Sequence, residues 1–261
     1  MAKRKPKILL WDIERSHSVV GTFGMYNTTI HYGSVLKHSS IICGAWKFLG
    51  EKKIYTSSIT DNKSIFKKDR GDDYYVVSAL KQAIESADVI VAHYGDKFDL
   101  KFFNTRCLYH GIAPVAKPIT IDTYKVAKKH FLFDFNKLDY LGQYLSVGSK
   151  LKTDNSMWLA VINPKVDHHS AIKKVEEMVK YNKQDVILLE KVYLKLHPFM
   201  DNHPNANLFI ESKVPVCPNC SSVHLHSRGY RRTRSSIFKR YNCQDCGAWS
   251  SGESVKTSGV K

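Results

Sequence analysis

The chain of 261 residues lacks several features that would place it in other protein classes. No uninterrupted apolar run reaches the roughly 18 residues that a membrane-spanning helix needs. The basic amino-terminal end is not followed by the apolar region and small-residue cleavage site of a secretory signal peptide. No internal repeat is present. Acidic residues are few, 24 against 40 Lys and Arg. The resulting net charge of +16 favours nucleic acid as the partner, and we expect no membrane partner.

Four of the acids that are present, and one tyrosine, stand in three short segments. Asp12 and Glu14 are two residues apart in an apolar run, so a strand would point both to one face. Tyr181 and Asp185 are four residues apart, so a helix would place them side by side. Asp99 ends the segment Gly-Asp-Lys-Phe-Asp. Converging carboxylates need a compensating charge, and Mg²⁺ or Mn²⁺ prefers oxygen ligands. Two such ions about 3.5–4 Å apart serve in-line attack on a phosphodiester.

Asp-x-Glu, Phe-Asp and Tyr-x-x-x-Asp, in this order, resemble the DEDD exonucleases of the RNase H-like superfamily, in the tyrosine (DEDDy) subclass. Over residues 7–197 the chain is similar to stand-alone relatives of the proofreading domain of family B DNA polymerases. Three further segments match, at residues 41–50, 121–123 and 136–141. One departure is Tyr94, where the family often has an Asn that contacts the substrate strand.

The resemblance implies two Mg²⁺ or Mn²⁺ ions and a role for each residue of the set. Asp12 would bridge the two ions, and Glu14 and Asp185 would hold the ion that activates water. Asp99 would support the second ion. Tyr181 would orient the attacking water, because the ordinary pKa of a tyrosine is too high for a base at neutral pH. The implied reaction releases 5′-nucleoside monophosphates from a 3′ end.

The order of expected elements is that of an α/β fold of the RNase H type, a mixed sheet flanked by helices. Apolar runs and alternation predict strands at residues 7–13, 29–37, 40–48, 53–58, 89–93 and 119–122. Helical spacing predicts helices at residues 75–87, 98–110, 137–145 and 170–196, and the polar stretch 61–73 predicts a loop. The expected domains are an exonuclease domain at 1–200, a linker at 201–213, a zinc ribbon at 214–250 and a disordered tail at 251–261.

Four of the six cysteines form two Cys-x-x-Cys pairs with 22 residues between them. They are Cys217 with Cys220 and Cys243 with Cys246. Each pair turns two thiolates toward one ion, so the two pairs together predict a structural, tetrahedral Zn²⁺ site. Disulfides are the weaker alternative, because the other features indicate a reducing cytoplasm, that of the host if the protein is of phage origin. A module of this size with few apolar side chains needs the metal to fold.

The segment between the two cysteine pairs is basic and aromatic, and it predicts a β-hairpin with a cationic tip. The module resembles the zinc ribbons of insertion-sequence transposases. Guanidinium groups bind phosphates in a bidentate manner, and aromatic rings stack on unpaired bases. The alternative is that the ribbon docks a protein. The candidate nucleic-acid contacts are Arg228, Arg231, Arg232, Arg234, Lys239 and Arg240.

The sequence thus favours a metal-dependent 3′–5′ exonuclease that hydrolyses phosphodiester bonds, with DNA preferred over RNA as substrate. Two alternatives keep the chemistry, namely trimming of RNA 3′ ends and structure-specific endonuclease cleavage. A third is an inactive adaptor that only binds nucleic acid, and the complete set of acids argues against it. The choice between DNA and RNA depends on a pocket that contacts the sugar, and no motif in the sequence describes that pocket.

Overall fold

The computed structural model describes residues 4–26, 29–116, 118–201, 203–210, 212 and 214–255. Its centre is a mixed sheet of five strands in the order β5–β4–β1–β6–β7. Strand β4 is antiparallel to β1 and β5, whereas β6 is parallel to β1 and β7. The strands are β1 (Ile8–Arg15), β4 (Ile41–Phe48), β5 (Tyr55–Ser58), β6 (Val89–Ala92) and β7 (Ile119–Asp122). The predicted RNase H-like α/β fold is confirmed.

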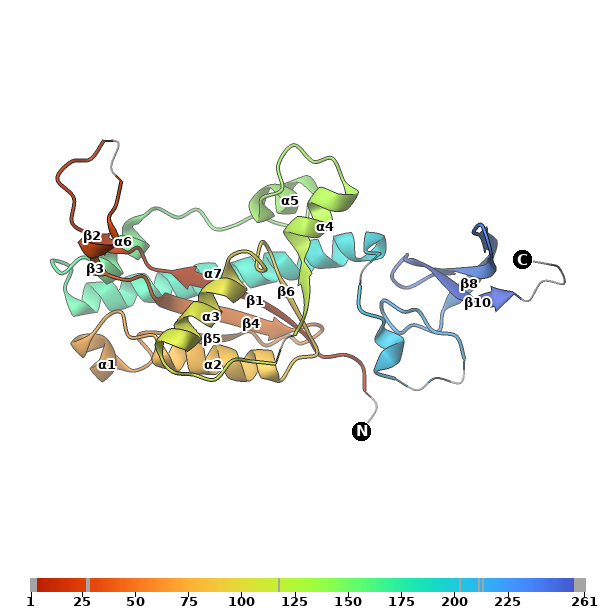
Figure 1. The fold of residues 1–261 in the computed structure, drawn as a ribbon, viewed down its shortest axis with the longest axis horizontal. Helices are drawn as coiled ribbons and strands as arrows, with labels where there is room; N and C mark the ends of the chain where they lie inside the picture. Colours follow the sequence, from red (N-terminus) through yellow and green to blue (C-terminus); the bar gives the residue numbers. More distant parts are fainter. Residues whose placement is uncertain are drawn as a thin grey trace.

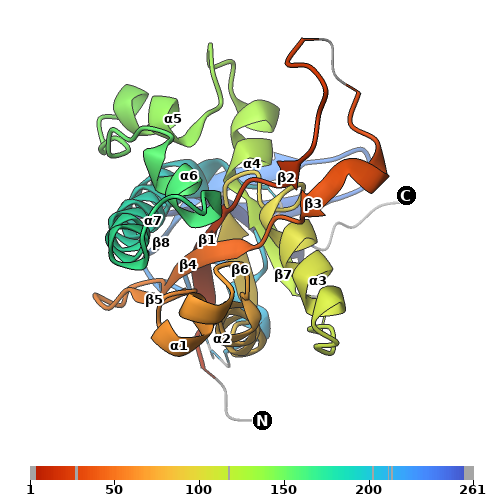
Figure 2. The same cartoon turned by 90° about the vertical axis from the view of Figure 1, so that its left-hand side faces the viewer.

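Helices flank this sheet on both sides (Figure 2). Helices α2 (Tyr74–Glu85) and α3 (Asp99–Tyr109) cover one face, and the long α7 (His168–Leu196) runs along the other. Helices α5 (Leu138–Tyr144) and α6 (Ser156–Ile162) pack against α7, which crosses the whole domain (Figure 1). Helices in the described ranges are too short or too polar to cross a membrane.

Alternation along β1 divides the core into two parts and also positions the acids. Leu9, Trp11 and Ile13 belong to the cluster on the α2 side, and Ile8 and Leu10 to the cluster around the second half of α7. Successive side chains of a strand point to opposite faces. Asp12 and Glu14, two and four places after Leu10, therefore also point toward α7.

Several local expectations were wrong. The predicted loop 61–73 contains α1 (Lys63–Lys68), because the Asn62 side chain accepts from the Ile65 N–H and Phe66 is buried. The predicted strand 29–37 is reduced to a 3₁₀ turn and β3 (Val35–Lys37), which pairs with β2 (Val19–Val20). Helices α4 (Thr123–His130) and α6 were not predicted. Asp122 begins α4 by accepting from the N–H groups of Tyr124 and Lys125.

The carboxy-terminal part forms a three-stranded sheet in the order β10–β9–β8 beside the end of α7 (Figure 1). Its strands are β8 (Leu225–Arg232), β9 (Ile237–Cys243) and β10 (Trp249–Val255). The disordered tail predicted from residue 251 is therefore wrong as far as Val255, and residues 256–261 lie outside the described part.

The predicted linker is attached to both neighbouring units along its described length. His203 Nε2 lies 2.8 Å from the hydroxyl of Tyr193 on α7, and Arg4 N–H donates to the Phe209 carbonyl at 3.1 Å. On the other side, Ala206 N–H donates to the carbonyl of Pro218 in the ribbon. The linker thus connects the nuclease-like domain and the ribbon through specific contacts.

Candidate functional site

Two carboxylates at the end of β1 face α7. Asp12 pairs with Ala45 of β4, Glu14 pairs with Cys43, and both acids retain partial solvent exposure. Asp185 projects from α7 toward them and is buried. One carboxylate oxygen from each of the three acids lies within 4.8 Å of the others. The structure therefore brings together three of the four predicted acids.

The fourth acid, Asp99, begins α3 beside this group. Its carboxylate accepts from the Ile13 N–H at 3.3 Å. This hydrogen bond connects α3 to β1 at the residue between Asp12 and Glu14. Asp99 is 3% exposed and does not belong to the group of three. A side chain at Gly95 would lie 2.3 Å from the Ala92 Cβ, so glycine is needed where the chain turns toward Asp99.

The acids raise one another's pKa values because they share a site from which water is partly excluded. Burial, followed by the charge of Asp185, raises the pKa of Glu14 to about 8. Burial also raises the pKa of Asp99 to about 7. The pKa of Asp12 is well above its ordinary range, because of burial and then the charges of Asp99 and Asp185. The site is therefore short of positive charge.

The arrangement of oxygens fits a divalent cation. Asp185 Oδ1 is buried and has no hydrogen-bond partner, so it is free to act as a ligand. Asp12 Oδ2 is held by the Asn182 amide at 2.6 Å, one helical turn before Asp185 on the same helix. Carboxylate oxygens with an uncompensated charge are the ligand set that Mg²⁺ or Mn²⁺ prefers. In the described part of the chain, only this group and the four cysteines combine three or more ligands in this way.

Lys150 is a residue of the site that the sequence analysis missed. Its Nζ donates to Asp185 Oδ2 at 2.6 Å and to the Tyr181 hydroxyl at 3.0 Å. The Lys150 backbone N–H donates to Asp139, which fixes the loop after α5. Nothing in the sequence distinguishes Lys150 from the other basic residues, because the loop that carries it has no regular pattern.

Tyr181 lies one turn before Asp185, as its spacing predicted. Burial, followed by the charge of Asp185, raises the pKa of its hydroxyl to about 12. The hydroxyl is therefore protonated at neutral pH and can both accept from Lys150 and donate elsewhere. Its ring meets the edge of Trp158, whose side chain also hydrogen-bonds Glu14. Trp158 was not predicted as part of the site.

A basic pocket of about 390 Å³ is lined by the segment that follows β6 and by α4. Tyr94 has a left-handed backbone, with φ 66°, and its N–H donates to Asp122 at 2.9 Å. The rings of Tyr94 and Tyr124 meet at 5.0 Å, edge to face. Four lysines complete the lining, namely Lys97, Lys125, Lys128 and Lys129.

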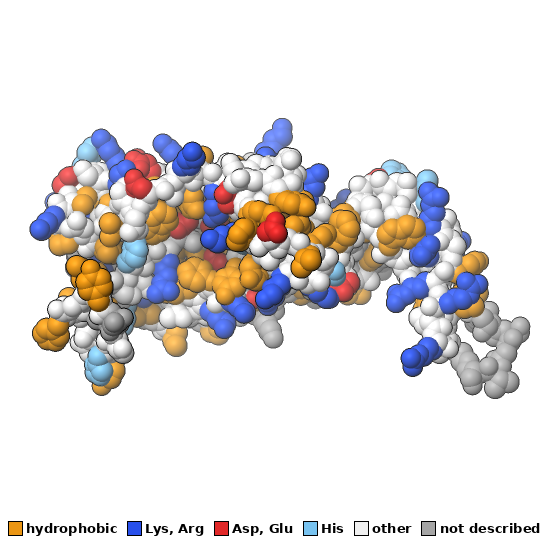
Figure 3. Space-filling model, turned by 90° about the horizontal axis from the view of Figure 1, so that it is seen from above, with side chains coloured by type: hydrophobic (Ala, Val, Ile, Leu, Met, Phe, Trp, Pro, Cys, Tyr) orange, Lys and Arg blue, Asp and Glu red, His pale blue; other side chains and the backbone are white. Residues whose placement is uncertain are grey.

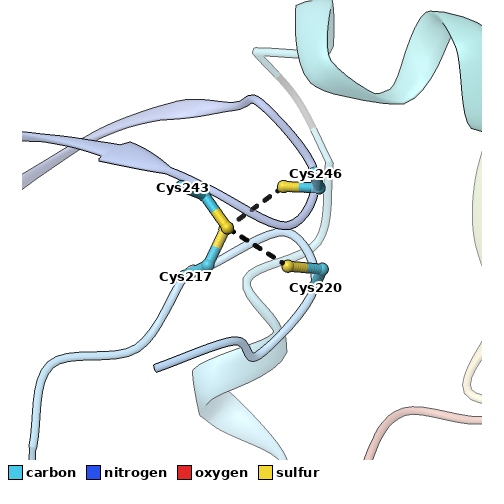
Figure 4. A group of neighbouring side chains, drawn as sticks. All are labelled: Cys217, Cys220, Cys243 and Cys246. Carbon is cyan, nitrogen blue, oxygen red and sulfur yellow. Dashed lines mark hydrogen bonds between the residues drawn. The ribbon is translucent and has the colours of Figure 1, made fainter. Parts of the chain in front are cut away.

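The four cysteines of the ribbon converge on one point (Figure 4). The Sγ atoms of Cys217 and Cys246 are 3.6 Å apart, as are those of Cys220 and Cys243. A disulfide would require about 2.05 Å. Zn–S bonds of about 2.3 Å in a tetrahedron place the sulfurs about 3.8 Å apart, close to the observed separation.

The two cysteine turns have the same backbone design. In each, the backbone N–H of the residue that follows the second cysteine donates to the carbonyl of the first cysteine. This following residue has a left-handed backbone. The residues concerned are Ser221, with φ 63°, and Gly247, with φ 78°. The cluster is consistent with a small zinc ribbon.

The six basic residues predicted to contact nucleic acid are all exposed on this ribbon. Lys and Arg side chains gather along it in Figure 3, which views the molecule from above. Three come from β8, two from β9 and one from the turn between them: Arg228, Arg231, Arg232, Lys239, Arg240 and Arg234.

Comparison with known proteins agrees with this geometry. A family model of the RNase H superfamily matches residues 48–197, which include Asp99, Lys150 and Asp185. The chain belongs to the RNase H superfamily. Among solved structures, the family B DNA polymerase from the hyperthermophilic archaeon Pyrobaculum calidifontis is similar, with a TM-score of 0.54 and 15% identity. The similarity covers 75% of this chain and 25% of the polymerase, and it supports the fold. No curated protein sequence matches the chain.

Membership of the RNase H superfamily and the acidic group together support a nuclease, and hence a nucleic-acid substrate. Asp12 and Glu14 precede the matched region, and β1 brings them to the acids that lie within it.

Proposed function

We propose that this member of the RNase H superfamily is a 3′–5′ exonuclease that hydrolyses DNA with two Mg²⁺ or Mn²⁺ ions. The observation that carries the proposal is the convergence of Asp12, Glu14 and Asp185 within 4.8 Å, with Asp99 alongside. The order of the motifs, which resembles proofreading exonucleases, supports the 3′–5′ direction. The structural similarity to a DNA polymerase supports DNA as the substrate.

The acids would hold the ions as the resemblance implies, with Asp12 shared between the two and Asp99 in a supporting position. Bound divalent ions would neutralise the carboxylates and lower the pKa of a water molecule enough for attack on the phosphodiester. Asn182 keeps one oxygen of Asp12 in place. The unpartnered Asp185 Oδ1 is available as a ligand.

Tyr181 and Lys150 would orient the reacting groups without taking up the proton. The raised pKa of Tyr181 keeps its hydroxyl protonated, so it can position the attacking water by hydrogen bonding. Lys150 holds this hydroxyl and Asp185 in a fixed relation. Its ammonium also brings positive charge near the point where a phosphate would gain negative charge.

The ribbon would bind one structural Zn²⁺ through Cys217, Cys220, Cys243 and Cys246, and would hold the nucleic acid. The sulfur separations and the matching backbone turns support the metal. Its exposed arginines and lysine would contact phosphates independently of sequence, so affinity would fall as salt concentration rises. The ribbon would add affinity and leave the chemistry to the other domain.

The test is to incubate the full chain and its Asp12→Ala variant with end-labelled DNA and Mn²⁺, and to resolve the products by length. The chain should shorten single strands from the 3′ end, and Asp12→Ala should abolish cleavage while the fold is retained. Glu85→Ala is the matched control, because it removes an exposed carboxylate of α2 on the other side of the sheet.

Undiminished cleavage by Asp12→Ala would contradict the metal assignment. Faster trimming of RNA than of DNA would assign the RNA alternative, and internal cuts in branched DNA would assign the endonuclease. Binding without cleavage in Mg²⁺ and Mn²⁺ would assign the inactive adaptor.

A further inference from the structure

The strand pairing of the ribbon sorts its side chains onto two faces. Residues directly opposite each other on neighbouring strands point to the same face. Trp249 pairs with Asn242, and Arg231 pairs with Phe238. Asn242, Arg240 and Phe238 alternate along β9 and therefore share a face. This face, which carries Trp249, Arg240 and Arg231, is named the Trp249 face.

The opposite face turns toward the linker. Tyr230 pairs with Lys239, and Ser250 pairs with Tyr241. Lys239 and Tyr241 line a cavity of about 740 Å³ whose other wall comes from the linker and the first cysteine turn, including Asn205 and Val216. The opposite face thus lies against protein near the cysteines, whereas Trp249, Arg240 and Arg231 do not line this cavity.

Trp249 is held in place but not covered. It is 55% exposed, which is unusual for so large an aromatic side chain. The Arg240 guanidinium lies 4.6 Å from the ring centre, and Arg240 Nε donates to the Arg228 carbonyl at 3.2 Å. That hydrogen bond fixes the guanidinium over the ring. The result is an oriented stack of a ring and a cation, open to solvent.

We propose that the Trp249 face binds a single strand of the substrate by stacking an unpaired base on the Trp249–Arg240 pair, with phosphates bound by Arg240 and Arg231. The inference rests on the proposed function for its substrate and extends it to the strandedness of that substrate. A planar ring next to planar guanidinium suits the face of an unpaired base. In a duplex the base faces are covered by their neighbours, so the same surface offers only phosphate contacts.

The position of the ribbon separates this contact from the catalytic acids. Asp185 lies 11 residues before Leu196, the last residue of α7, a distance of about 16 Å along the helix. The ribbon follows beyond that end (Figure 1). At the rise of about 3.4 Å per nucleotide of a stacked strand, about 5 nucleotides would cover the distance from Asp185 to the end of α7.

The experiment measures binding of a labelled thymidine oligonucleotide of about 12 nucleotides, within the site sizes of single-strand proteins. The full-length, zinc-loaded chain carries Asp12→Ala so that the strand stays intact. Dissociation constants are measured by fluorescence anisotropy at several salt concentrations, for the single strand and for a duplex of equal length. Trp249→Ala, Trp249→Phe, Arg231→Gln and Tyr230→Ala are compared in this background.

Trp249→Ala should weaken single-strand binding about 5- to 150-fold, the range for loss of one stacked base, with little change in salt dependence. Trp249→Phe should restore most of the affinity because it keeps a ring. Arg231→Gln should reduce the slope of log affinity against log salt by about 0.7. Tyr230→Ala is the control, since Tyr230 is 52% exposed on the opposite face and its loss should change affinity less than about twofold.

Equal losses for Trp249→Ala and Tyr230→Ala would overturn the face assignment. Equal losses of single-strand and duplex binding by Trp249→Ala would overturn the stacking role, as would a Trp249→Phe variant as weak as Trp249→Ala with its zinc retained. The proposed nuclease activity is tested separately, on the chain with Asp12 intact. If the chain does not cleave DNA but Trp249→Ala still weakens single-strand binding more than duplex binding, the proposed nuclease activity is rejected and the single-strand site is retained.

Discussion

Replacing Lys150 with methionine tests how the site manages its charge. Methionine keeps a long unbranched side chain and removes the ammonium that donates to Asp185 at 2.6 Å and to Tyr181 at 3.0 Å. Asp185 is 1% exposed and its other oxygen already lacks a partner, so the variant leaves this carboxylate without a positive charge in hydrogen-bond contact. The loss should lower the turnover rate and, separately, strengthen the binding of Mn²⁺.

The turnover rate should fall, and the metal requirement should decrease. A hydrogen bond to a charged group contributes about 1.5–3 kcal/mol, which corresponds to about a 10- to 150-fold lower rate if it is needed in the transition state. The same substitution makes the acidic group more negative, so half-maximal activity should require less Mn²⁺ than in the unmodified chain. A residue that merely supported the fold would lower activity without moving the Mn²⁺ requirement in this direction.

The assay is a titration of initial cleavage rate against Mn²⁺ for the unmodified chain, Lys150→Met and Lys81→Met. Lys81 is the control because it forms a comparable lysine–carboxylate pair with Glu85 on the surface of α2. Lys81→Met should leave both the rate and the Mn²⁺ requirement unchanged. An unchanged rate for Lys150→Met, or a higher Mn²⁺ requirement, would refute the reasoning.

Three further predictions follow from the same geometry. Tyr181→Phe should slow cleavage about 10²-fold with metal binding retained, as measured by single-turnover rates and Mn²⁺ titration, whereas an unchanged rate would make Tyr181 structural. Because the pKa values of Glu14 and Asp99 are raised to about 8 and about 7, the metal-free protein should lose stability as pH rises from about 4 to 8, since the unfolded chain releases these protons first. Mn²⁺ should accordingly raise the melting temperature more at pH 8 than at pH 6, and equal shifts would contradict the burial of these acids. Removal of zinc by a chelator, or Cys217→Ser, should unfold the ribbon, weaken DNA binding and flatten its salt dependence. Binding equal to that of the zinc-loaded chain at every salt concentration would instead make the ribbon a protein-docking module.

The parts of the site that could be predicted are those fixed by the periodicity of a single element. Asp12 with Glu14 follows from the alternation of a strand, and Tyr181 with Asp185 from the turn of a helix. Lys150 could not be predicted in this way. Its position depends on a loop in which Ser146 and Gly148 both have positive φ, and no periodicity describes such a path.

The same distinction separates the predicted fold from its errors. The central strands and α7 have long apolar patterns, so their existence was predictable. Helices α1 and α4 depend on single side-chain caps, Asn62 and Asp122, within polar surroundings that resemble a loop. The Trp249 face of the ribbon could not be predicted from the sequence either, because only the strand pairing reveals that Trp249 and Arg240 share a face.

The attached linker determines where the chain can be divided for expression. His203 bonds the buried Tyr193, and Phe209 accepts from Arg4 near the amino-terminal end, so both belong physically to the nuclease domain. A fragment that stops at residue 200 would leave the end of α7 uncovered and prone to association. A boundary just after Ile210 would keep this cover, and the two fragments should differ in solubility even though both contain all four acids of the proposed active site.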